Sequence, residues 1–280
     1  MPKVLSAAAI EQYRSAGYYF PVRVLSEADA TGYRRQLEEY EARTGAPIGG
    51  PYRHKSHLLF TWLDELVRVP RILDVVEDVL GPDILCWSTS FFIKEPQTRA
   101  YVSWHQDATY WGLSSPDVMT VWVGFTASNL ESGCMKVIPG THTTDVVPHR
   151  DTFAKDNLLT RGQEVAVEVD DKKAVDLIMA PGEASLHHVR LVHGSEPNKS
   201  QDRRIGFAIR YIPTYVRQIA GATDSATLVR GKDAHGNFET EPRPRRDLDP
   251  ETVAFHQATT ERQAKILYRG TGVESFGSRA

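Results

Sequence analysis

A series of short segments rich in β-forming residues, between residues 84 and 212, constrains the fold more than any other feature of this sequence. β-Branched and aromatic residues favour extended backbone, and turn residues such as Pro139-Gly140 separate the segments. Because no helical pattern lies between them, they predict a sandwich or barrel and not a parallel sheet with crossover helices. The predicted strands are residues 84–93, 118–125, 135–138, 165–169, 184–186, 191–192 and 205–212.

Helical patterns flank this β region on both sides, so the predicted fold class is mainly β with flanking helices. Gly17 ends a run of helix formers, and Ser26 begins a capping-box pattern. The predicted helices are residues 7–16, 26–43, 58–69, 72–80 and 250–268. We expect one domain over residues 1–280, with a mostly helical cover at 1–82, the β core at 83–215 and a C-terminal extension at 216–280.

Composition excludes several classes of protein. Hydrophobic residues make up 41% and charged residues 25% of the 280, as is usual for globular chains. The formal net charge of −3 gives no general attraction to nucleic acid or an anionic membrane. No segment has the ~18 apolar residues of a membrane span, the N-terminus lacks a secretory pattern, and two cysteines exclude a disulfide scaffold. We expect a cytoplasmic protein with a small-molecule substrate, without a nucleic-acid or membrane partner; the sequence leaves the oligomeric state open.

Two histidines stand two positions before an aspartate, a spacing that can serve a metal ion. In extended backbone such residues project to the same side, so His105 and Asp107 can reach one ion. Ten histidines and 36 acidic residues produce about one such pair by chance, and an isolated pair is more often a surface contact. Aromatic residues surround the first pair. His149 and Asp151 lie in a polar connection and are expected to be solvated.

A third ligand must come from another part of the chain. His193 follows an apolar pair and precedes Gly194-Ser195, as at a strand end. Two histidines and one carboxylate on one face of iron(II) leave the opposite face open for substrate and oxygen. Arg204 stands at the start of a predicted strand, where its planar guanidinium can pair with a carboxylate near the metal. Taken alone, Arg204 is better explained by a surface salt bridge.

The combination of these motifs resembles the phytanoyl-CoA dioxygenase family over about residues 8–215. The matching segments are residues 13–18, 80–85, 105–107, 133–142 and 193–200, with an arginine eleven residues after His193. The resemblance implies a double-stranded β-helix, or jelly-roll, core. It also implies an iron(II)- and 2-oxoglutarate-dependent oxygenase that consumes O2.

The resemblance implies a role for six positions. The implied metal ligands and catalytic residues are His105, Asp107 and His193. The implied contacts of 2-oxoglutarate are Arg204, Ser195 and Lys94. Halogenating relatives carry Ala or Gly at the position of Asp107, so the carboxylate present here favours hydroxylation over halogenation.

Further residues are candidates for contact with substrate or with the ligands: His187, Trp104, Tyr110, Trp122, Phe125 and His54. For the aromatic members, ordinary core packing is an equally good explanation. Lys55, His57 and residues 241–246 are expected in solvated loops, and His256 on the surface. Arg210 and Arg217 can reach an anionic group of a substrate, but the sequence does not fix where they point.

The expected reaction is hydroxylation of an unactivated C–H bond in a small polar metabolite or natural-product intermediate, with release of succinate and CO2. Two alternatives stay open. The same iron centre can support desaturation, epimerisation or cyclisation, and a jelly roll can be a ligand-binding protein without catalytic activity.

Overall fold

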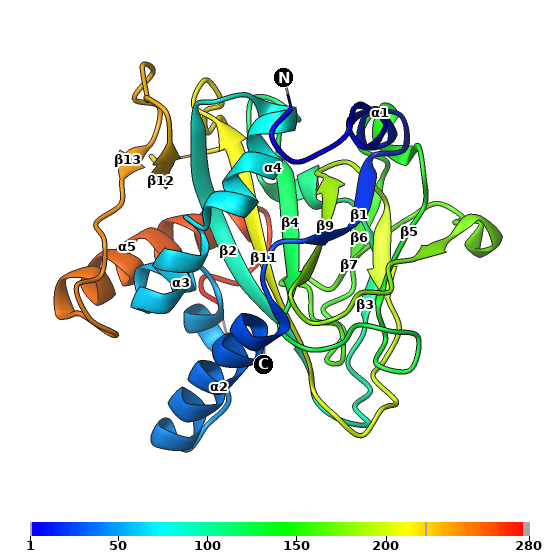
Figure 1. Ribbon diagram of the computed structural model, residues 1–280, viewed down its shortest axis with the longest axis horizontal. Coiled ribbons are helices and arrows are strands. Elements are labelled where there is room, and N and C mark those ends of the chain that lie inside the picture. Colours follow the sequence, from blue (N-terminus) through cyan, green and yellow to red (C-terminus); the bar gives the residue numbers. More distant parts are fainter. Residues whose placement is uncertain (1, 222, 277–280) are drawn as a thin grey trace.

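Two β-sheets form the centre of the computed structural model, which describes residues 2–221 and 223–276 (Figure 1). The major sheet has the strand order β1-β9-β4-β11-β2-β12-β13, and the minor sheet has the order β3-β10-β5-β8. The described strand pairs are antiparallel, apart from the parallel pair β12–β13. This arrangement confirms the predicted fold class, a mainly β protein with flanking helices and a double-stranded β-helix core.

The strands of the major sheet are β1 (Tyr18–Arg23), β2 (Ile84–Lys94), β4 (Met119–Gly124), β9 (Glu183–His188), β11 (Arg204–Pro213), β12 (Ser225–Arg230) and β13 (Glu239–Thr240). Those of the minor sheet are β3 (Val102–His105), β5 (Met135–Val137), β8 (Val175–Asp176) and β10 (His193–Ser195), while β6 (His149–Asp151) pairs with β7 (Gln163–Val165). The α-helices are α1 (Ala7–Ala16), α2 (Glu27–Thr44), α3 (Thr61–Leu66), α4 (Pro70–Leu80) and α5 (Pro250–Leu267).

The first two helices begin and end at the residues that the sequence indicates. The Ser26 side chain accepts a hydrogen bond from the backbone N–H of Asp29 and satisfies one of the free donors at the start of α2. Gly17 and Gly45 close α1 and α2 in the left-handed conformation, with φ of 84° and 71°. Glycine adopts this conformation without the steric cost that a Cβ imposes.

Side chains along β11 alternate between the two faces of the major sheet, of which one packs into the hydrophobic core. Ile205, Phe207, Ile209 and Tyr211 are buried in the main hydrophobic core together with residues of α1 to α4. Figure 1 shows α3 and α4 against this face of the major sheet. The intervening residues point the other way because successive side chains of a strand alternate between faces. The helices thus seal one face of the sheet, and the functional groups collect on the other.

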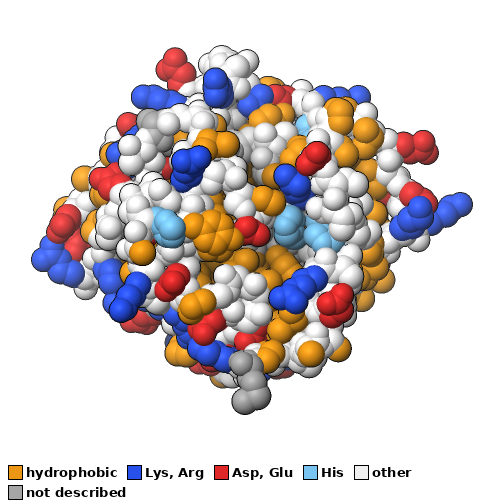
Figure 2. All heavy atoms as spheres, turned by 90° about the horizontal axis from the view of Figure 1, so that it is seen from above, with side chains coloured by type: hydrophobic (Ala, Val, Ile, Leu, Met, Phe, Trp, Pro, Cys, Tyr) orange, Lys and Arg blue, Asp and Glu red, His pale blue; other side chains and the backbone are white. Residues whose placement is uncertain are grey.

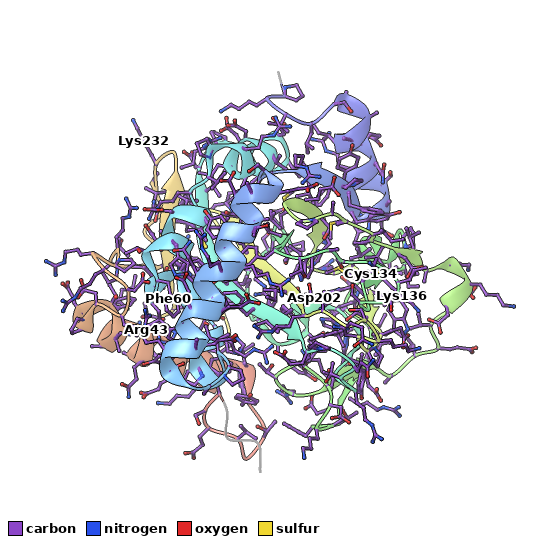
Figure 3. The ribbon with its side chains drawn as sticks, turned by 60° about the horizontal axis from the view of Figure 1, so that its bottom comes forward. Arg43, Phe60, Cys134, Lys136, Asp202 and Lys232 are labelled. Carbon is purple, nitrogen blue, oxygen red and sulfur yellow. The ribbon has the colours of Figure 1, made fainter. Side chains whose placement is uncertain are left out.

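Aromatic contacts attach the helical cover to the sheet. Phe60, at the start of α3, packs edge-to-face on Tyr40 of α2 with ring centroids 4.9 Å apart, and Phe91 of β2 lies 4.8 Å from Phe207. Figure 3 shows Phe60 beside α2, with Cys134 and Lys136 far from it, at the minor sheet. The helical layer and the minor sheet therefore occupy different sides of the molecule.

Several elements differ from the sequence-based expectation. Residues 18–23 form an edge strand of the major sheet inside the segment expected to be mostly helical. The strand predicted at 165–169 instead ends at Val165, and the extension after residue 216 contributes β12 and β13. These strands are short and lack strong alternation, so their pairing partners decide their conformation. No helix in the described ranges is long and apolar enough to cross a membrane.

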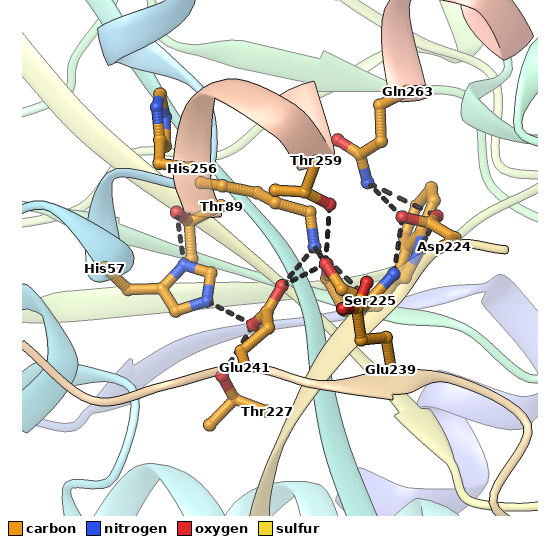
Figure 4. A network of polar contacts seen from close by, with 12 residues as sticks. His57, Thr89, Asp224, Ser225, Thr227, Glu239, Glu241, His256, Thr259 and Gln263 are labelled. Carbon is orange, nitrogen blue, oxygen red and sulfur yellow. Dashed lines mark hydrogen bonds and ion pairs between the residues drawn. The ribbon is translucent and has the colours of Figure 1, made fainter. Parts of the chain in front are cut away.

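The prediction of solvated loops at Lys55, His57 and Glu241 is wrong. All three side chains are fully buried and form one polar network (Figure 4). Lys55 Nζ lies 2.5 Å from Glu241 Oε1 and donates to the carbonyls of Trp87 and Ser225. Burial opposes the charge on Glu241, but Lys55 and then His57 outweigh it and hold the pKa of that carboxyl well below its usual range.

This network joins segments that are remote in sequence. Thr227 of β12 donates to Glu241 at 2.6 Å, and Ser225 shares a 2.6 Å hydrogen bond with Thr259 of α5. His256 of α5, expected on the surface, is 1% exposed and bonds the carbonyl of His54 at 2.8 Å. The network therefore fastens the C-terminal extension to the loop after α2 and to β2.

Candidate active site

His105, Asp107 and His193 meet at the open end of the minor sheet. His193 is the first residue of β10 and pairs in register with His105, the last residue of β3. Asp107 begins the short 3₁₀ helix that follows, and His105 Nε2 lies 3.3 Å from Asp107 Oδ1. One potential ligand atom from each residue lies within 4.8 Å of the others, and all three residues are buried. The strand pairing thus brings together residues 88 positions apart.

Backbone carbonyls orient both imidazole rings. His105 Nδ1 lies 2.9 Å from the Ser103 carbonyl and 3.0 Å from the His193 carbonyl, and His193 Nδ1 lies 2.9 Å from the Leu191 carbonyl. A carbonyl only accepts, so each Nδ1 carries the proton and each Nε2 keeps a lone pair. Metal-binding histidines are held in this way, with the non-ligating nitrogen donating to a carbonyl.

The protonation states fit a divalent cation. Burial by itself opposes ionisation of Asp107, but the adjacent His105, then His193 and Arg210, hold its pKa well below the usual range. Burial, and then the neighbouring His105, hold the pKa of His193 well below 6.5. Two neutral imidazoles and one carboxylate form the ligand set of non-haem iron(II) sites.

An inner cavity, lined by His105, Asp107, Thr120, Trp122, His187, His193, Ser195, Arg204 and neighbouring residues, extends from the triad between the two sheets. Arg204 lies at its far end and is 2% exposed. Its Nη1 donates to the Gly133 carbonyl at 2.5 Å, while its Nε has no partner in the described part of the chain. Burial lowers the pKa of Arg204 to about 10, so the side chain remains a cation at neutral pH.

Two glycines make room for this cation. A Cβ on Gly206 would lie 1.8 Å from the Trp122 ring, which packs across β11 at 5.3 Å from the Arg204 guanidinium. Gly133 has a φ of 68°, and a Cβ there would lie 2.2 Å from the Glu196 carbonyl. Each site excludes larger residues by backbone or ring contact, so both shape the end of the inner cavity.

Lys94 supports the inner cavity from behind. It is paired in register with Arg204, and its Nζ donates to Ser195 Oγ at 2.6 Å and to the carbonyls of Gly133 and Glu196. Burial, and then the charge of Arg204, lower its pKa to about 6. Ser195 lines the cavity and Lys94 does not, so Lys94 is placed to orient Ser195 and not to touch a ligand.

A second, outer cavity adjoins the first and shares Phe92, Asp107 and Arg210 with it. It encloses about 750 Å³ including its mouth. Figure 2 shows a hollow on this face where histidine, acidic and hydrophobic side chains gather. Its other lining residues include Arg53, His54, Trp87, Ser88, Ser90, Tyr110, Trp111, Asp224, Gln263 and Phe276. A concave, largely apolar space beside a metal-binding triad is the usual form of a substrate site.

The remaining candidates for contact with substrate or ligand differ in whether their side chains face a cavity or the hydrophobic core. Trp122 and His187 line the inner cavity, and His187 Nδ1 is buried without a partner in the described residues. Trp104 and Phe125 line neither cavity. Phe125 packs in the core against Tyr33, at 5.3 Å between ring centroids, because its position is odd where Thr120 and Trp122 are even. The expectation that Phe125 and Trp104 reach substrate or ligand is therefore not supported.

His54 and Tyr110 face the outer cavity. The His54 ring stacks on Phe276 with centroids 4.2 Å apart, and burial, followed by the charges of Arg53 and Arg210, holds its pKa well below 6.5. Tyr110 donates to Asp151 at 2.8 Å. Both residues line the cavity wall, so both are placed for contact with a substrate.

The second His-x-Asp pair lies outside the triad and is structural. His149 accepts a hydrogen bond from the backbone N–H of Gln106 at 3.0 Å, and Asp151 is paired with Arg161. Both residues are half-buried on β6 and not in a fully solvated connection.

Sequence reasoning did not identify the C-terminal wall of the outer cavity. Asp224, Gln263, Ile266, Leu267 and Phe276 all line it. No motif marks these positions, and only tertiary contact brings them there. Arg210 carried a detectable signal, because it follows Arg204 by six residues on one strand and must face the same side.

Residues 1–206 match the family described as Phytanoyl-CoA dioxygenase (PhyH), and the chain belongs to this family. The predicted membership of an iron(II)- and 2-oxoglutarate-dependent oxygenase family is therefore confirmed. Arg210 and the C-terminal wall lie beyond the matched residues.

Three similar proteins span different shares of the chain. A "Probable alpha-ketoglutarate-dependent hypophosphite dioxygenase" of Stutzerimonas stutzeri is 32% identical over 156 residues, which are 55% of this chain and 54% of that protein. "Phytanoyl-CoA dioxygenase, peroxisomal" of Homo sapiens is 25% identical over 72% of this chain and 66% of its own length. The solved structure "non-heme monooxygenase; ThoJ apo" has a TM-score of 0.83 and 36% identity, covering 92% of this chain and 97% of that one.

Proposed function

We propose that this protein is an iron(II)- and 2-oxoglutarate-dependent oxygenase that hydroxylates a C–H bond of a small organic molecule bound in the outer cavity. The observation that carries the proposal is the buried triad, in which two oriented imidazoles direct free Nε2 lone pairs toward the side of Asp107. His105, Asp107 and His193 are the proposed ligands of iron(II). Iron(II) with 2-oxoglutarate supplies the oxygen-activating chemistry, in which 2-oxoglutarate becomes succinate and CO2.

Arg204 is the proposed partner of the distal carboxylate of 2-oxoglutarate. Its buried guanidinium has one backbone acceptor and an unpartnered Nε, so a carboxylate can complete its hydrogen bonds. Ser195, oriented by Lys94, is placed to donate to the same carboxylate. Trp122 stacks beside Arg204 and excludes water from the pair.

Asp107 favours hydroxylation over halogenation. Its carboxylate occupies the third ligand position and lies on the wall shared by the inner and outer cavities. A substrate in the outer cavity is thereby held next to the metal, beside the aromatic side chains of that cavity.

Metal binding tests the proposal without relying on turnover. We expect the wild-type protein to bind iron(II) under anaerobic conditions and to develop the visible absorption of an iron(II)–2-oxoglutarate chelate when 2-oxoglutarate is added. Asp107→Ala is expected to weaken iron(II) binding about a hundredfold or more, which exceeds the usual loss for residues that only orient a ligand. His149→Ala is the matched control from the other His-x-Asp pair and should retain the chelate. Folded wild-type protein without the chelate band would favour a ligand-binding role.

A further inference from the structure

Arg210 is a buried cation that forms no ion pair with the described protein, although the carboxylate of Asp107 lies near enough to act on it through its charge. Its side chain is 6% exposed on β11, and it forms no hydrogen bond or ion pair with any described residue; its Nε is fully enclosed. Its neighbours are the rings of Trp111 and Phe92, at 5.4 Å and 5.8 Å from the guanidinium carbon. Burying an unpaired charge is strongly unfavourable, so such a group marks a place where an anion binds.

The carboxylates that line the outer cavity or bond to its wall already have partners. Asp224 accepts from Trp87 Nε1 at 2.6 Å and from Gln263. Asp151 is occupied by Arg161 and Tyr110. Asp107 faces both cavities, but it contacts His105 and forms no ion pair with Arg210. Arg53, the other cation of the outer cavity, donates to the Phe91 and Leu158 carbonyls.

Charge accounting separates Arg210 from the cofactor site, and this step rests on the proposed function. Iron(II) carries two positive charges and Arg204 one, and the Asp107 carboxylate and doubly charged 2-oxoglutarate neutralise all three. Arg210 then stays uncompensated at the boundary of the outer cavity. The charges at the metal site therefore sum to zero without Arg210. The anion that pairs with Arg210 must then belong to another molecule.

We propose that the substrate is an organic anion whose carboxylate pairs with Arg210 and whose apolar or aromatic body lies against the rings of the outer cavity. Trp87 and Trp111 have centroids 5.1 Å apart and form one wall, and Phe92 lies beside Arg210. Planar guanidinium binds a carboxylate through two parallel hydrogen bonds. This contact fixes the distance from the anionic group to the carbon that faces the triad, so Arg210 selects the position of oxidation.

Another part of the wall belongs to the C-terminal extension. Gln263, Ile266 and Leu267 of α5, with Phe276, enclose the body of the substrate. Both Arg210 and this wall lie outside residues 1–206, which match the family. Arg210 and one part of the proposed substrate wall therefore come from the region that the family match does not cover, and the aromatic wall of Trp87, Phe92 and Trp111 comes from within it.

A matched pair of probes tests the proposal: 3-phenylpropionate and its neutral amide, 3-phenylpropionamide. Each is titrated by calorimetry into the full chain loaded anaerobically with iron(II) and saturating 2-oxoglutarate. We expect the carboxylate to bind at least about tenfold more tightly than the amide. Arg210→Gln should reduce carboxylate affinity to that of the amide and leave the amide unchanged. Arg210→Lys should recover part of the difference.

Two controls locate the effect. Arg217→Gln removes an exposed arginine of the same chain region and should leave both affinities unchanged. Arg204→Gln should lower the affinity for 2-oxoglutarate, whereas Arg210→Gln should change that affinity less than about twofold. Thermal unfolding of each variant establishes that it is folded.

Equal affinities for the two probes, or no binding of either, would overturn the proposal. It would also fail if Arg210→Gln weakened 2-oxoglutarate and not 3-phenylpropionate, because Arg210 would then belong to the cofactor site. If wild-type protein did not bind iron(II) and 2-oxoglutarate, the proposed function would fail separately. The same pair of probes, titrated into the protein alone, would still decide whether Arg210 binds an organic anion.

Discussion

Two buried polar clusters of this molecule differ in whether their charged groups are paired within the protein. In the network of Lys55, His57 and Glu241, the ammonium and the carboxylate are paired and every charged atom has hydrogen-bond partners (Figure 4). In the two cavities, Arg204 has one backbone acceptor and Arg210 has no partner among the described residues. Both clusters are removed from water, so burial alone does not distinguish a structural group from a binding group.

The difference shows that a structural charged group and a ligand-binding charged group are distinguished by whether their polar atoms have hydrogen-bond partners within the protein. A satisfied network repays its desolvation within the protein and fixes segments in place. A buried cation without a partner keeps an unfavourable desolvation free energy until an anionic ligand pairs with it. Binding of that ligand then stabilises the folded state. Substitutions should therefore affect stability in the first cluster and ligand affinity in the second.

Glu241→Ala should produce the largest change in stability. It leaves Lys55 buried without its carboxylate, and breaking a buried pair in this way costs about 3–5 kcal/mol. The free energy of unfolding, measured by urea denaturation, should fall by that amount. Glu251→Ala is the control, because this exposed partner of Arg245 should change stability by about 0–1 kcal/mol. If both variants lost a similar free energy of unfolding, the buried Lys55–Glu241 pair would contribute no more than the exposed Arg245–Glu251 pair, and the distinction would fail.

Arg204→Gln should weaken 2-oxoglutarate binding by about 30- to 100-fold, or about 2–3 kcal/mol. The unliganded protein should lose little stability, because the substitution also removes an incompletely paired buried charge. Titration of 2-oxoglutarate and thermal unfolding without it measure the two effects separately. A large loss of stability with unchanged affinity would make Arg204 a structural residue like Lys55.

Gly206→Ala should destabilise the protein by about 1–3 kcal/mol and weaken 2-oxoglutarate binding, because the new methyl group displaces Trp122 beside Arg204. Gly32→Ala in α2 is the matched control. A Cβ at Gly32 meets no atom within 4 Å, so alanine should stabilise the helix by about 0.5–1 kcal/mol. Equal effects at the two sites would contradict the close contact with Trp122.

The last expected effect, which appears only at acidic pH, is the pH dependence of stability contributed by His256, next to the satisfied network. Burial lowers its pKa from 6.5 to about 4. Between these values the unfolded chain binds more protons than the folded one, so stability is full above pH 6.5 and falls as the pH drops toward 4. The loss should be on the order of 1–3 kcal/mol. His256→Gln should flatten this part of the stability profile, and an unchanged slope would assign it to other groups.

Local sequence determined the helix ends and the long strands. Ser26 and Gly45 delimit α2, and residues 84–93 lie within β2, because capping groups and β-branched residues act over a few neighbouring positions. The motifs also singled out His105, Asp107 and His193 before their positions in space were known. His105 ends a strand, His193 begins one, and Asp107 begins the short 3₁₀ helix two residues after His105, so all three stand at element ends, where short-range pattern is informative.

Tertiary structure decided which side chains share an environment. The register of β10 with β3 places His193 opposite His105, and the burial of Glu241 against Lys55 joins residues 186 positions apart. Local sequence preference does not specify a distant ion-pair partner. The sequence therefore predicted that Lys55 and Glu241 would be exposed to solvent. By itself the sequence determined the family and the triad. Only packing decided that Arg210 would be buried without an ion pair to any described residue, because that depends on every segment that closes around it.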